Sequence, residues 1–260
     1  MSQRGELIFL GSGTSQGVPV IGCDCEVCMS KDVRDNRTRS SIHIQFAGLS
    51  LQIDTGPDFR TQMLREGLTH VDAVLFTHEH QDHVAGLDDV RPIIFRVRKE
   101  MALYGQQRVL DRIKKAFDYA FKAQPYPGAP SFTTTSIEAE LAFTINGVEV
   151  LPLGINHGNL PILGYRIGDT AYLTDVNEIP DEAMEQLSGL NYLILDALHR
   201  KEHYSHFNLT QAIEWATKIG ARHTYFIHMS HYMGKHEDVE KELPEGMQLS
   251  FDGLRIPVTI

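Results

Sequence analysis

The chain of 260 residues is 42% hydrophobic and 22% charged, which is typical of a folded globular protein and excludes a disordered one. The formal net charge of -10 repels nucleic-acid phosphates, so nucleic acid is not an expected partner, whereas a small anionic molecule held by metal ions would avoid that repulsion. No linker-like composition shift divides the sequence, and we therefore expect a single domain over residues 1–260.

The first expected element is a short strand at residues 6–10, followed by a loop of small residues at 11–17. The apolar run at residues 7–10 is too short for a signal-peptide core or a membrane span. We therefore expect a cytoplasmic protein without a membrane partner.

A cysteine cluster follows, in which Cys23, Cys25 and Cys28 lie within six residues. Three cysteines at this spacing do not suit a disulfide framework, and metal binding is the leading interpretation. A closed tetrahedral zinc site needs a fourth ligand, which His231 can supply. We therefore predict one structural Zn²⁺ ion; buried or redox-active thiols are the alternative.

The next segment alternates polar and apolar residues at 41–46 and 49–54 around Ala47 and Gly48, which predicts a β-hairpin. A helix is expected from Pro57 to about residue 65, and a buried strand at 73–76 leads directly into the sequence THEHQDH. Helical spacing then begins near residue 84 and recurs at 105–122, before the loop QPYPGAPS.

The second half predicts further strands, at residues 141–145, 148–153, 164–167, 171–174, 192–196 and 223–228. Helices are expected at about 180–188 and 208–219. Both halves thus run hairpin, strand, helix, strand. This order favours an α/β (α+β) protein with two stacked sheets and outer helices over one doubly wound sheet.

The THEHQDH segment holds four candidate metal ligands, His78, His80, Asp82 and His83. Imidazole nitrogen with carboxylate oxygen suits zinc, manganese or iron(II), and this set suits a pair of hydrolytic metal ions. A run of surface histidines is the alternative. Three later candidates, His157, Asp175 and His228, each follow an apolar strand-like run and can meet this segment at a sheet edge.

This pattern, His-x-His-x-Asp-His followed by a distant His, Asp and His, resembles the metallo-β-lactamase superfamily. The resemblance implies a four-layer αββα sandwich with the site at the edge between the sheets. It implies one catalytic Zn²⁺ or Mn²⁺ ion on His78, His80 and His157 and another on Asp82, His83 and His228. Asp175 would bridge the two ions.

The loop GTSQGVP, the C-x-C-x-x-C cysteines and the H-x-S-H segment further resemble the phosphodiesterase family of the carbon–phosphorus lyase pathway, which acts on phosphoribosyl 1,2-cyclic phosphate. A related family of pyrroloquinoline quinone biosynthesis has a degraded histidine motif, whereas this one is intact. The resemblance implies a metal-dependent phosphodiesterase acting on a small cyclic or nucleotide-like phosphodiester, and a homodimer.

The implied reaction uses a hydroxide activated by the binuclear metal site, with Asp82 counted among the catalytic residues as well as the ligands. The expelled sugar oxygen needs a proton, and the resemblance assigns this role to His206 in YSHFNLT, with His199 and His203 as rivals. Asp196 is either a carboxylate that orients a histidine or a turn residue.

Two further segments are candidate anion contacts. The backbone N–H groups of Ser12, Gly13, Thr14 and Ser15 either face an anion or form a plain turn. The arginines of residues 34–39 could contact a phosphate, but a solvated basic loop is the more common meaning of such a run.

Other functions share the same ligands. A tRNA 3′-end endoribonuclease or a glyoxalase II-like thioester hydrolase would use the same metals, but neither accounts for the cysteine loop. A catalytically silent protein that binds a ligand or a metal is the alternative that is not an enzyme.

Overall fold

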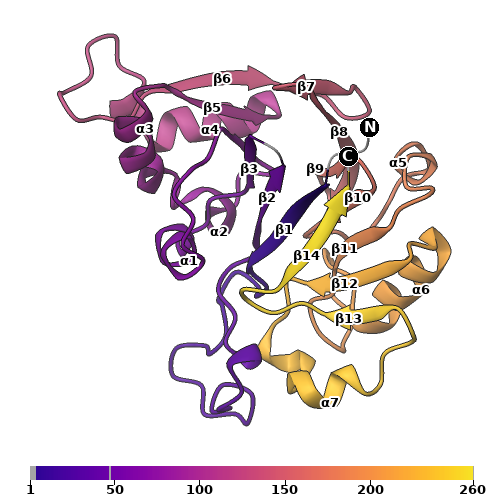
Figure 1. The fold of residues 1–260 in the computed structure, drawn as a ribbon. Coiled ribbons are helices and arrows are strands. Elements are labelled where there is room, and N and C mark those ends of the chain that lie inside the picture. Colours follow the sequence, from indigo (N-terminus) through magenta and orange to yellow (C-terminus); the bar gives the residue numbers. More distant parts are fainter. Residues whose placement is uncertain (1–3, 47, 260) are drawn as a thin grey trace.

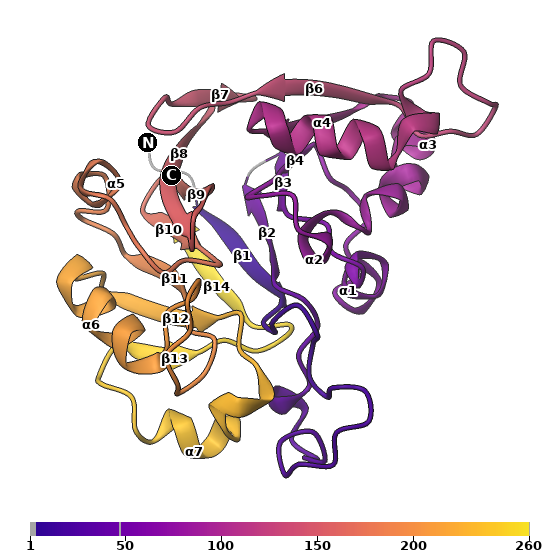
Figure 2. The same ribbon diagram turned by 180° about the vertical axis from the view of Figure 1, so that it is seen from behind.

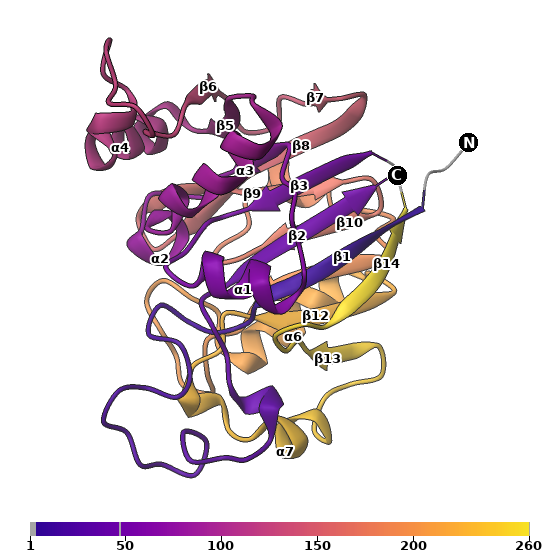
Figure 3. The same ribbon diagram turned by 60° about the vertical axis from the view of Figure 1, so that its left-hand side comes forward.

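The computed structural model describes residues 4–46 and 48–259 and contains two seven-stranded sheets with helices on their outer faces. Figure 3 shows the first sheet in front of the second, with α1–α3 on the near side and α6 behind. The expected αββα sandwich is thus confirmed. Ala47, part of the predicted hairpin turn, lies outside the described residues.

The first sheet has the strand order β14-β1-β2-β3-β4-β5-β6. Antiparallel pairing joins β14, β1, β2 and β3, and parallel pairing joins β3 to β6. Its strands are β1 (Arg4–Gly11), β2 (Ser41–Phe46), β3 (Leu49–Ile53), β4 (Ala73–Leu75), β5 (Met101–Gly105), β6 (Phe132–Ser136) and β14 (Arg255–Thr259).

The outer face of this sheet is covered by helices from the first half of the chain (Figure 1). Their apolar side chains and those of β1, β4 and β5 form one buried cluster. The helices are α1 (Phe59–Arg65), α2 (Gln81–Val84), α3 (Arg91–Val97) and α4 (Gln107–Ala116), with single 3₁₀ turns at Leu87–Val90 and Asp118–Ala120.

The second sheet has the order β13-β12-β11-β10-β9-β8-β7, with parallel pairing from β10 to β13. Its outer face carries α5, α6 and α7 (Figure 2). The elements are β7 (Phe143–Ile145), β8 (Val148–His157), β9 (Leu160–Ile167), β10 (Thr170–Leu173), α5 (Asp181–Glu185), β11 (Tyr192–Asp196), α6 (Leu209–Ile219), β12 (His223–Ile227), α7 (His236–Glu240) and β13 (Met247–Leu249).

The inner faces of the two sheets share one buried core. Leu7 and Ile44 from the first sheet belong to the same apolar cluster as Leu163 and Ile194 from the second. Each of these side chains alternates with a residue that faces the outer helices, as period-2 strands require.

Several elements differ from the sequence-based expectation. The expected helix at 105–122 is shorter, because α4 begins at Gln107 after β5 and ends at Ala116, where a separate 3₁₀ turn follows at Asp118–Ala120. Strand β6 has the mostly polar sequence FTTTS and lies at the edge of its sheet, so it carries little hydrophobic signal. The C-terminal α7, β13 and β14 were not predicted either, because each is only three to five residues long.

The topology gathers strand ends at one edge. Strands β3 and β4 are parallel and end together, and the parallel strands β10, β11 and β12 end together in the other sheet. The residues after these strands therefore lie beside one another where the two sheets meet. No helix among residues 4–46 and 48–259 is long and apolar enough to cross a membrane.

Candidate active site

The first group of candidate ligands comes from both sheets. His78 and His80 lie in the turn between β4 and α2, and His157 is the last residue of β8. One ligand atom from each side chain lies within 4.8 Å of the others. His78 and His157 are buried whereas His80 is exposed, so this side of the group is open to a substrate.

The second group consists of Asp82, His83, Asp175 and His228, whose ligand atoms also lie within 4.8 Å of one another. Asp175 lies between the two groups. One of its carboxylate oxygens is 3.4 Å from Nε2 of His83 and 3.1 Å from Nδ1 of His228, while the other is 3.9 Å from Nε2 of His78. The structure thus brings together all seven predicted ligands, and their assignment to metal ions stays a prediction.

Three residues of the site have a left-handed backbone conformation. Asp54 and His228 directly follow β3 and β12, and Asp175 lies two residues after β10; their φ angles are 62°, 64° and 57°. Left-handed backbone is uncommon for residues other than glycine, although Asp and His tolerate it better than most, and it is often found at functional sites. Each turn directs a strand-end side chain across the sheet edge toward the cluster.

A buried metal ion fits the chemistry of the second group. Nε2 of His83 and Nδ1 of His228 are buried and lie near the Asp175 carboxylate, at 3.4 Å and 3.1 Å, but neither makes a well-directed hydrogen bond. Unpaired buried polar atoms are costly, and a bound cation satisfies imidazole nitrogens and carboxylate oxygens together. The donors present therefore suit divalent metal ions.

The electrostatics of the cluster support a cation. Burial lowers the pKa of His83, but the charges of Asp175 and Asp82 outweigh it and hold that pKa well above its ordinary value. Burial would raise the pKa of Asp175, yet the neighbouring histidines hold it well below its ordinary range. These carboxylates are thus ionised and available to a positive charge.

Asp54 supports the candidate site from behind, and it was not identified from the sequence. Its buried carboxylate accepts a hydrogen bond from Nδ1 of His83 at 2.7 Å and from the backbone N–H of Thr77 at 2.9 Å. It therefore orients the His83 ring with Nε2 toward the cluster, as carboxylates behind metal-binding histidines commonly do. The available signal was an acidic residue at the end of an apolar strand, which also marked Asp175.

His206 and Asp196 form a buried pair beside the cluster. Nδ1 of His206 lies 3.2 Å and 3.3 Å from the two oxygens of Asp196, the last residue of β11. Burial lowers the pKa of His206, but the carboxylate of Asp196 outweighs it and raises the pKa to about 9. The ring lies 4.6 Å from that of His157 and 4.9 Å from that of His228.

The two rival histidines are placed differently. The His203 ring lies 5.1 Å from His206, and His199 lies beyond it, 5.9 Å from His203. Burial lowers the pKa of both His199 and His203. His206 alone of the three shares a candidate ligand group with His157 and Asp175, and so lies beside the cluster, while its role as proton donor stays a prediction.

The cysteine loop and His231 meet in a separate group outside the sheets. Nδ1 of His231 lies 3.3 Å from Sγ of Cys23 and 3.4 Å from Sγ of both Cys25 and Cys28. A tetrahedral zinc ion with bonds of about 2.3 Å to sulfur and 2.0 Å to nitrogen would separate the two atoms by about 3.5 Å. The four side chains therefore fit one zinc ion.

Thiolate chemistry in this group supports the same interpretation. The backbone N–H of Cys28 donates to the Cys25 sulfur and lowers the pKa of Cys25 to about 6. Burial raises the pKa of Cys28 to about 11, with the neighbouring sulfurs adding to the effect. Neighbouring thiolates repel one another. A cation among the three sulfurs would offset that repulsion and hold all three deprotonated.

The two candidate anion contacts are contradicted in part. The backbone N–H groups of Ser12, Gly13 and Thr14 donate to Asp252, Thr38 and Met229, so they do not face an anion. Of the arginines of residues 34–39, Arg37 is buried, which a solvated loop would not predict. Arg34 and Arg39 stay partly exposed and pair with Asp32 and Asp58.

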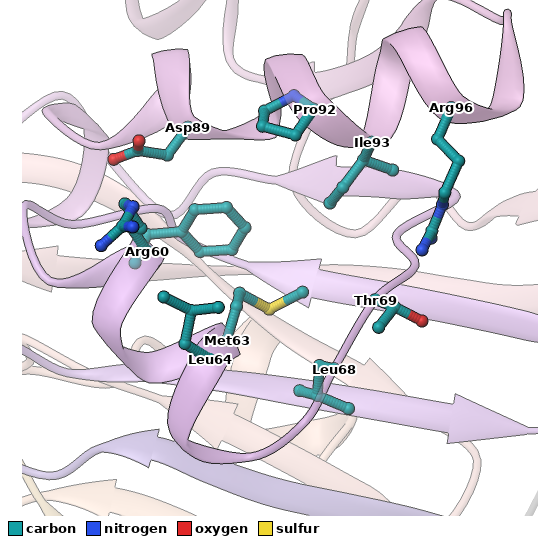
Figure 4. A pocket seen from close by; sticks show the side chains of 10 residues that line it. Arg60, Met63, Leu64, Leu68, Thr69, Asp89, Pro92, Ile93 and Arg96 are labelled. Carbon is teal, nitrogen blue, oxygen red and sulfur yellow. The ribbon is translucent and has the colours of Figure 1, made fainter.

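A cavity of about 350 Å³ lies between α1 and α3, apart from the candidate ligands. Figure 4 shows Met63, Leu64 and Ile93 pointing into it, with Arg60 and Arg96 at opposite ends. None of the candidate metal ligands lines it, so we do not assign the reaction to this cavity.

Comparison with known proteins agrees with this geometry. The family model described as "Beta-lactamase superfamily domain" matches residues 51–229. An octanoyltransferase of Porphyromonas gingivalis is 45% identical over 249 residues, which cover 95% of this chain but 50% of that protein. The chain thus spans half the length of this relative.

Solved structures are similar over the whole chain. A structure described as a new diphosphatase from the PhnP family is 42% identical, with a TM-score of 0.94, covering 100% of this chain and 99% of that one. Zn²⁺-bound PqqB from Methylobacterium extorquens has a TM-score of 0.81 at 20% identity, covering 96% and 99% of the two chains. The second likeness concerns the fold alone.

Proposed function

Because the chain belongs to the metallo-β-lactamase superfamily and, within it, to the PhnP family, its chemistry is that of a metal-dependent hydrolase, and we propose that its substrate is a small phosphodiester. The proposed substrate is a cyclic or nucleotide-like compound. The seven-residue cluster would hold two catalytic Zn²⁺ or Mn²⁺ ions, and the cysteine group would hold one structural Zn²⁺.

The observation that carries this proposal is the His206–Asp196 pair beside the cluster. Asp196 accepts the hydrogen bond at Nδ1 of His206, so the proton at Nε2 is free for transfer. A phosphodiester expels an alkoxide, a poor leaving group that requires a proton in the transition state. A histidine held protonated by a buried carboxylate supplies that proton beside the reacting phosphate.

Other residues position the reacting groups. Two divalent ions, when bound, supply a nucleophile from water at neutral pH and polarise a phosphoryl oxygen. Asp54 fixes the His83 ring, the backbone carbonyl of Ser205 accepts from Nδ1 of His157 at 2.8 Å, and Thr174 donates to Asp175 at 2.7 Å. These contacts hold the cluster in place without help from the substrate.

A diphosphate is the second candidate substrate, because the 42% identical structure is described as a diphosphatase. Hydrolysis of a phosphoanhydride expels a phosphate, which leaves without needing a strong proton donor. The two candidates therefore differ in how far they depend on His206.

The testing experiment compares leaving groups in His206→Ala. For a substrate with an alkoxide leaving group, such as adenosine 2′,3′-cyclic phosphate, kcat should fall by about 10²- to 10⁴-fold. For bis(p-nitrophenyl) phosphate, whose leaving group needs no proton, the fall should be about tenfold or less. The same leaving-group dependence in His203→Ala instead of His206→Ala would contradict the assignment.

A substrate panel separates the remaining functions. Zinc- and manganese-loaded protein is assayed with cyclic phosphates, linear diesters, a dinucleoside diphosphate, S-lactoylglutathione, octanoyl thioesters and precursor tRNA. The octanoyl thioester is included because of the name of the Porphyromonas relative. Turnover of the thioesters alone would reject a phosphodiesterase, and metal binding without any turnover would favour the silent binding protein.

A further inference from the structure

Two exposed tyrosines lie beside the two candidate metal centres, Tyr204 near His206 and Tyr232 with its ring 4.0 Å from that of His231. Tyr204 is 82% exposed and Tyr232 is 70% exposed, although large aromatic side chains usually bury most of their surface. Tyr204 lies two residues before His206, and a Cβ atom added to Gly158, the residue after His157, would lie 3.5 Å from the Tyr204 ring. This ring therefore lies against the backbone next to a candidate metal ligand.

Two histidine rings connect these tyrosines. The ring of His203 lies 4.8 Å from that of Tyr204 and 5.9 Å from that of His199, and His199 lies 6.3 Å from Tyr232. We call Tyr204, His203, His199 and Tyr232 the aromatic strip. It joins the reaction site through His203, whose ring lies 5.1 Å from that of His206.

We propose that the aromatic strip stacks the nucleobase of the substrate, with Tyr204 as the main contact, while the phosphate of the same molecule lies at the metal cluster. This inference rests on the proposed function for the position of the phosphate. It narrows the substrate to a nucleotide and assigns specificity to a residue outside the cluster.

The chemistry of the strip favours a base over other groups. Every nucleobase presents a π-face, and aromatic side chains stack on it with little dependence on base identity. The net charge of -10 disfavours a long polyanion, so a mononucleotide or dinucleotide is the expected source of the base rather than RNA.

Binding of product-like ligands tests the inference without requiring turnover. Isothermal calorimetry compares adenosine 5′-monophosphate with ribose 5-phosphate on the full, metal-loaded chain. We expect adenosine 5′-monophosphate to bind about tenfold more tightly, and Tyr204→Ala to remove that difference while Tyr204→Phe retains it. Tyr126→Ala is the matched control, since Tyr126 is also exposed but lies in the loop that follows α4.

Kinetics provides the second readout. For adenosine 2′,3′-cyclic phosphate, Tyr204→Ala should raise KM about tenfold, whereas for the methyl riboside cyclic phosphate, which lacks a base, the increase should be less than about twofold. A short oligoribonucleotide serves as a third ligand. If Tyr204→Ala weakened only that ligand, the strip would serve RNA and the nucleotide assignment would be wrong.

The outcomes separate this inference from the proposed function. Equal binding of adenosine 5′-monophosphate and ribose 5-phosphate, or unchanged binding in Tyr204→Ala, overturns the stacking site even if phosphodiesters are hydrolysed. Base-dependent binding that Tyr204→Ala removes supports the stacking site even if no phosphodiester is hydrolysed, in which case the proposed reaction alone fails.

Discussion

The two candidate metal centres are built from different parts of the chain. The seven-residue cluster takes its side chains from strand ends, from the turn before α2 and from α2 itself, elements that belong to the two sheets and their helix layer. The cysteine group takes three ligands from the segment between β1 and β2, where the structure has one 3₁₀ turn, at Val33–Asp35, and no strand. Figure 1 shows this segment extending beside α7, away from the sheets.

The two centres differ in what holds their ligands in position. At the cluster, buried partners such as Asp54 and Ser205 already orient the ligand histidines. At the cysteine group, the buried apolar contacts are few, with Val18, Val27 and Cys28 forming a small separate cluster. We infer that the first site binds metal for chemistry, and that the second binds metal to hold its loop.

Removing a ligand from the cluster should have the largest effect on catalysis. In His80→Ala we expect kcat to fall by about 10³-fold or more, because losing one ion removes several kcal/mol of charge stabilisation. His80 is exposed, so the fold should persist. The control is His70→Ala, which removes a surface histidine paired with Asp72. A phosphodiesterase rate close to wild type in His80→Ala would contradict the assignment of catalysis to the seven-residue cluster.

Weakening a residue behind the ligands should have a smaller effect. Asp54→Asn should lower metal affinity or activity by about 10- to 100-fold, because His83 loses the charged partner that orients it. Metal competition titrations and kcat measure this change. Asp72→Asn is the matched control, because it alters a carboxylate–histidine pair outside the cluster. A loss in Asp72→Asn as large as that in Asp54→Asn would contradict the assignment.

The pH dependence of kcat tests whether His206 is the proton donor. A proton donor acts only while protonated, so kcat for an alkoxide leaving group should fall as the pH rises through about 9, the raised pKa of His206. Asp196→Asn removes the charge that raises this pKa, and the decline should then begin nearer the ordinary histidine value of about 6.5. The pH profile with bis(p-nitrophenyl) phosphate should lack the decline. An unchanged profile in Asp196→Asn would mean that another group donates the proton.

The cysteine group should affect catalysis least and stability most. Cys25→Ser should lose one zinc ion per chain and lower Tm by about 6–12 °C, if the bound metal contributes about 3 kcal/mol. Metal analysis and calorimetry measure both, and kcat of the folded protein should change little. The control is Asp24→Asn in the same loop. Complete loss of turnover in folded Cys25→Ser would show that the loop takes part in the reaction.

Much of the fold followed from local patterns. The hairpin of β2 and β3, the strands β4, β8 and β11, and the helix α6 each have the hydrophobic period that predicts them. Strands β6 and β13 were missed, because an exposed edge strand or a three-residue strand shows too little alternation of apolar and polar residues to be detected. Their place depends on pairing with distant residues.

The residues of the candidate site likewise divide into those that the sequence indicated and those that only the tertiary structure placed. The sequence by itself determined the candidate ligands, because their donor types and spacing are visible in THEHQDH and in the cysteine loop. The resemblance to the superfamily already implied that Asp175 lies between the two groups. Only the tertiary structure decided that Asp54 supports His83 and that Asp196 faces His206. These contacts join residues on different strands, and their distances depend on sheet pairing and backbone turns that no local pattern specifies.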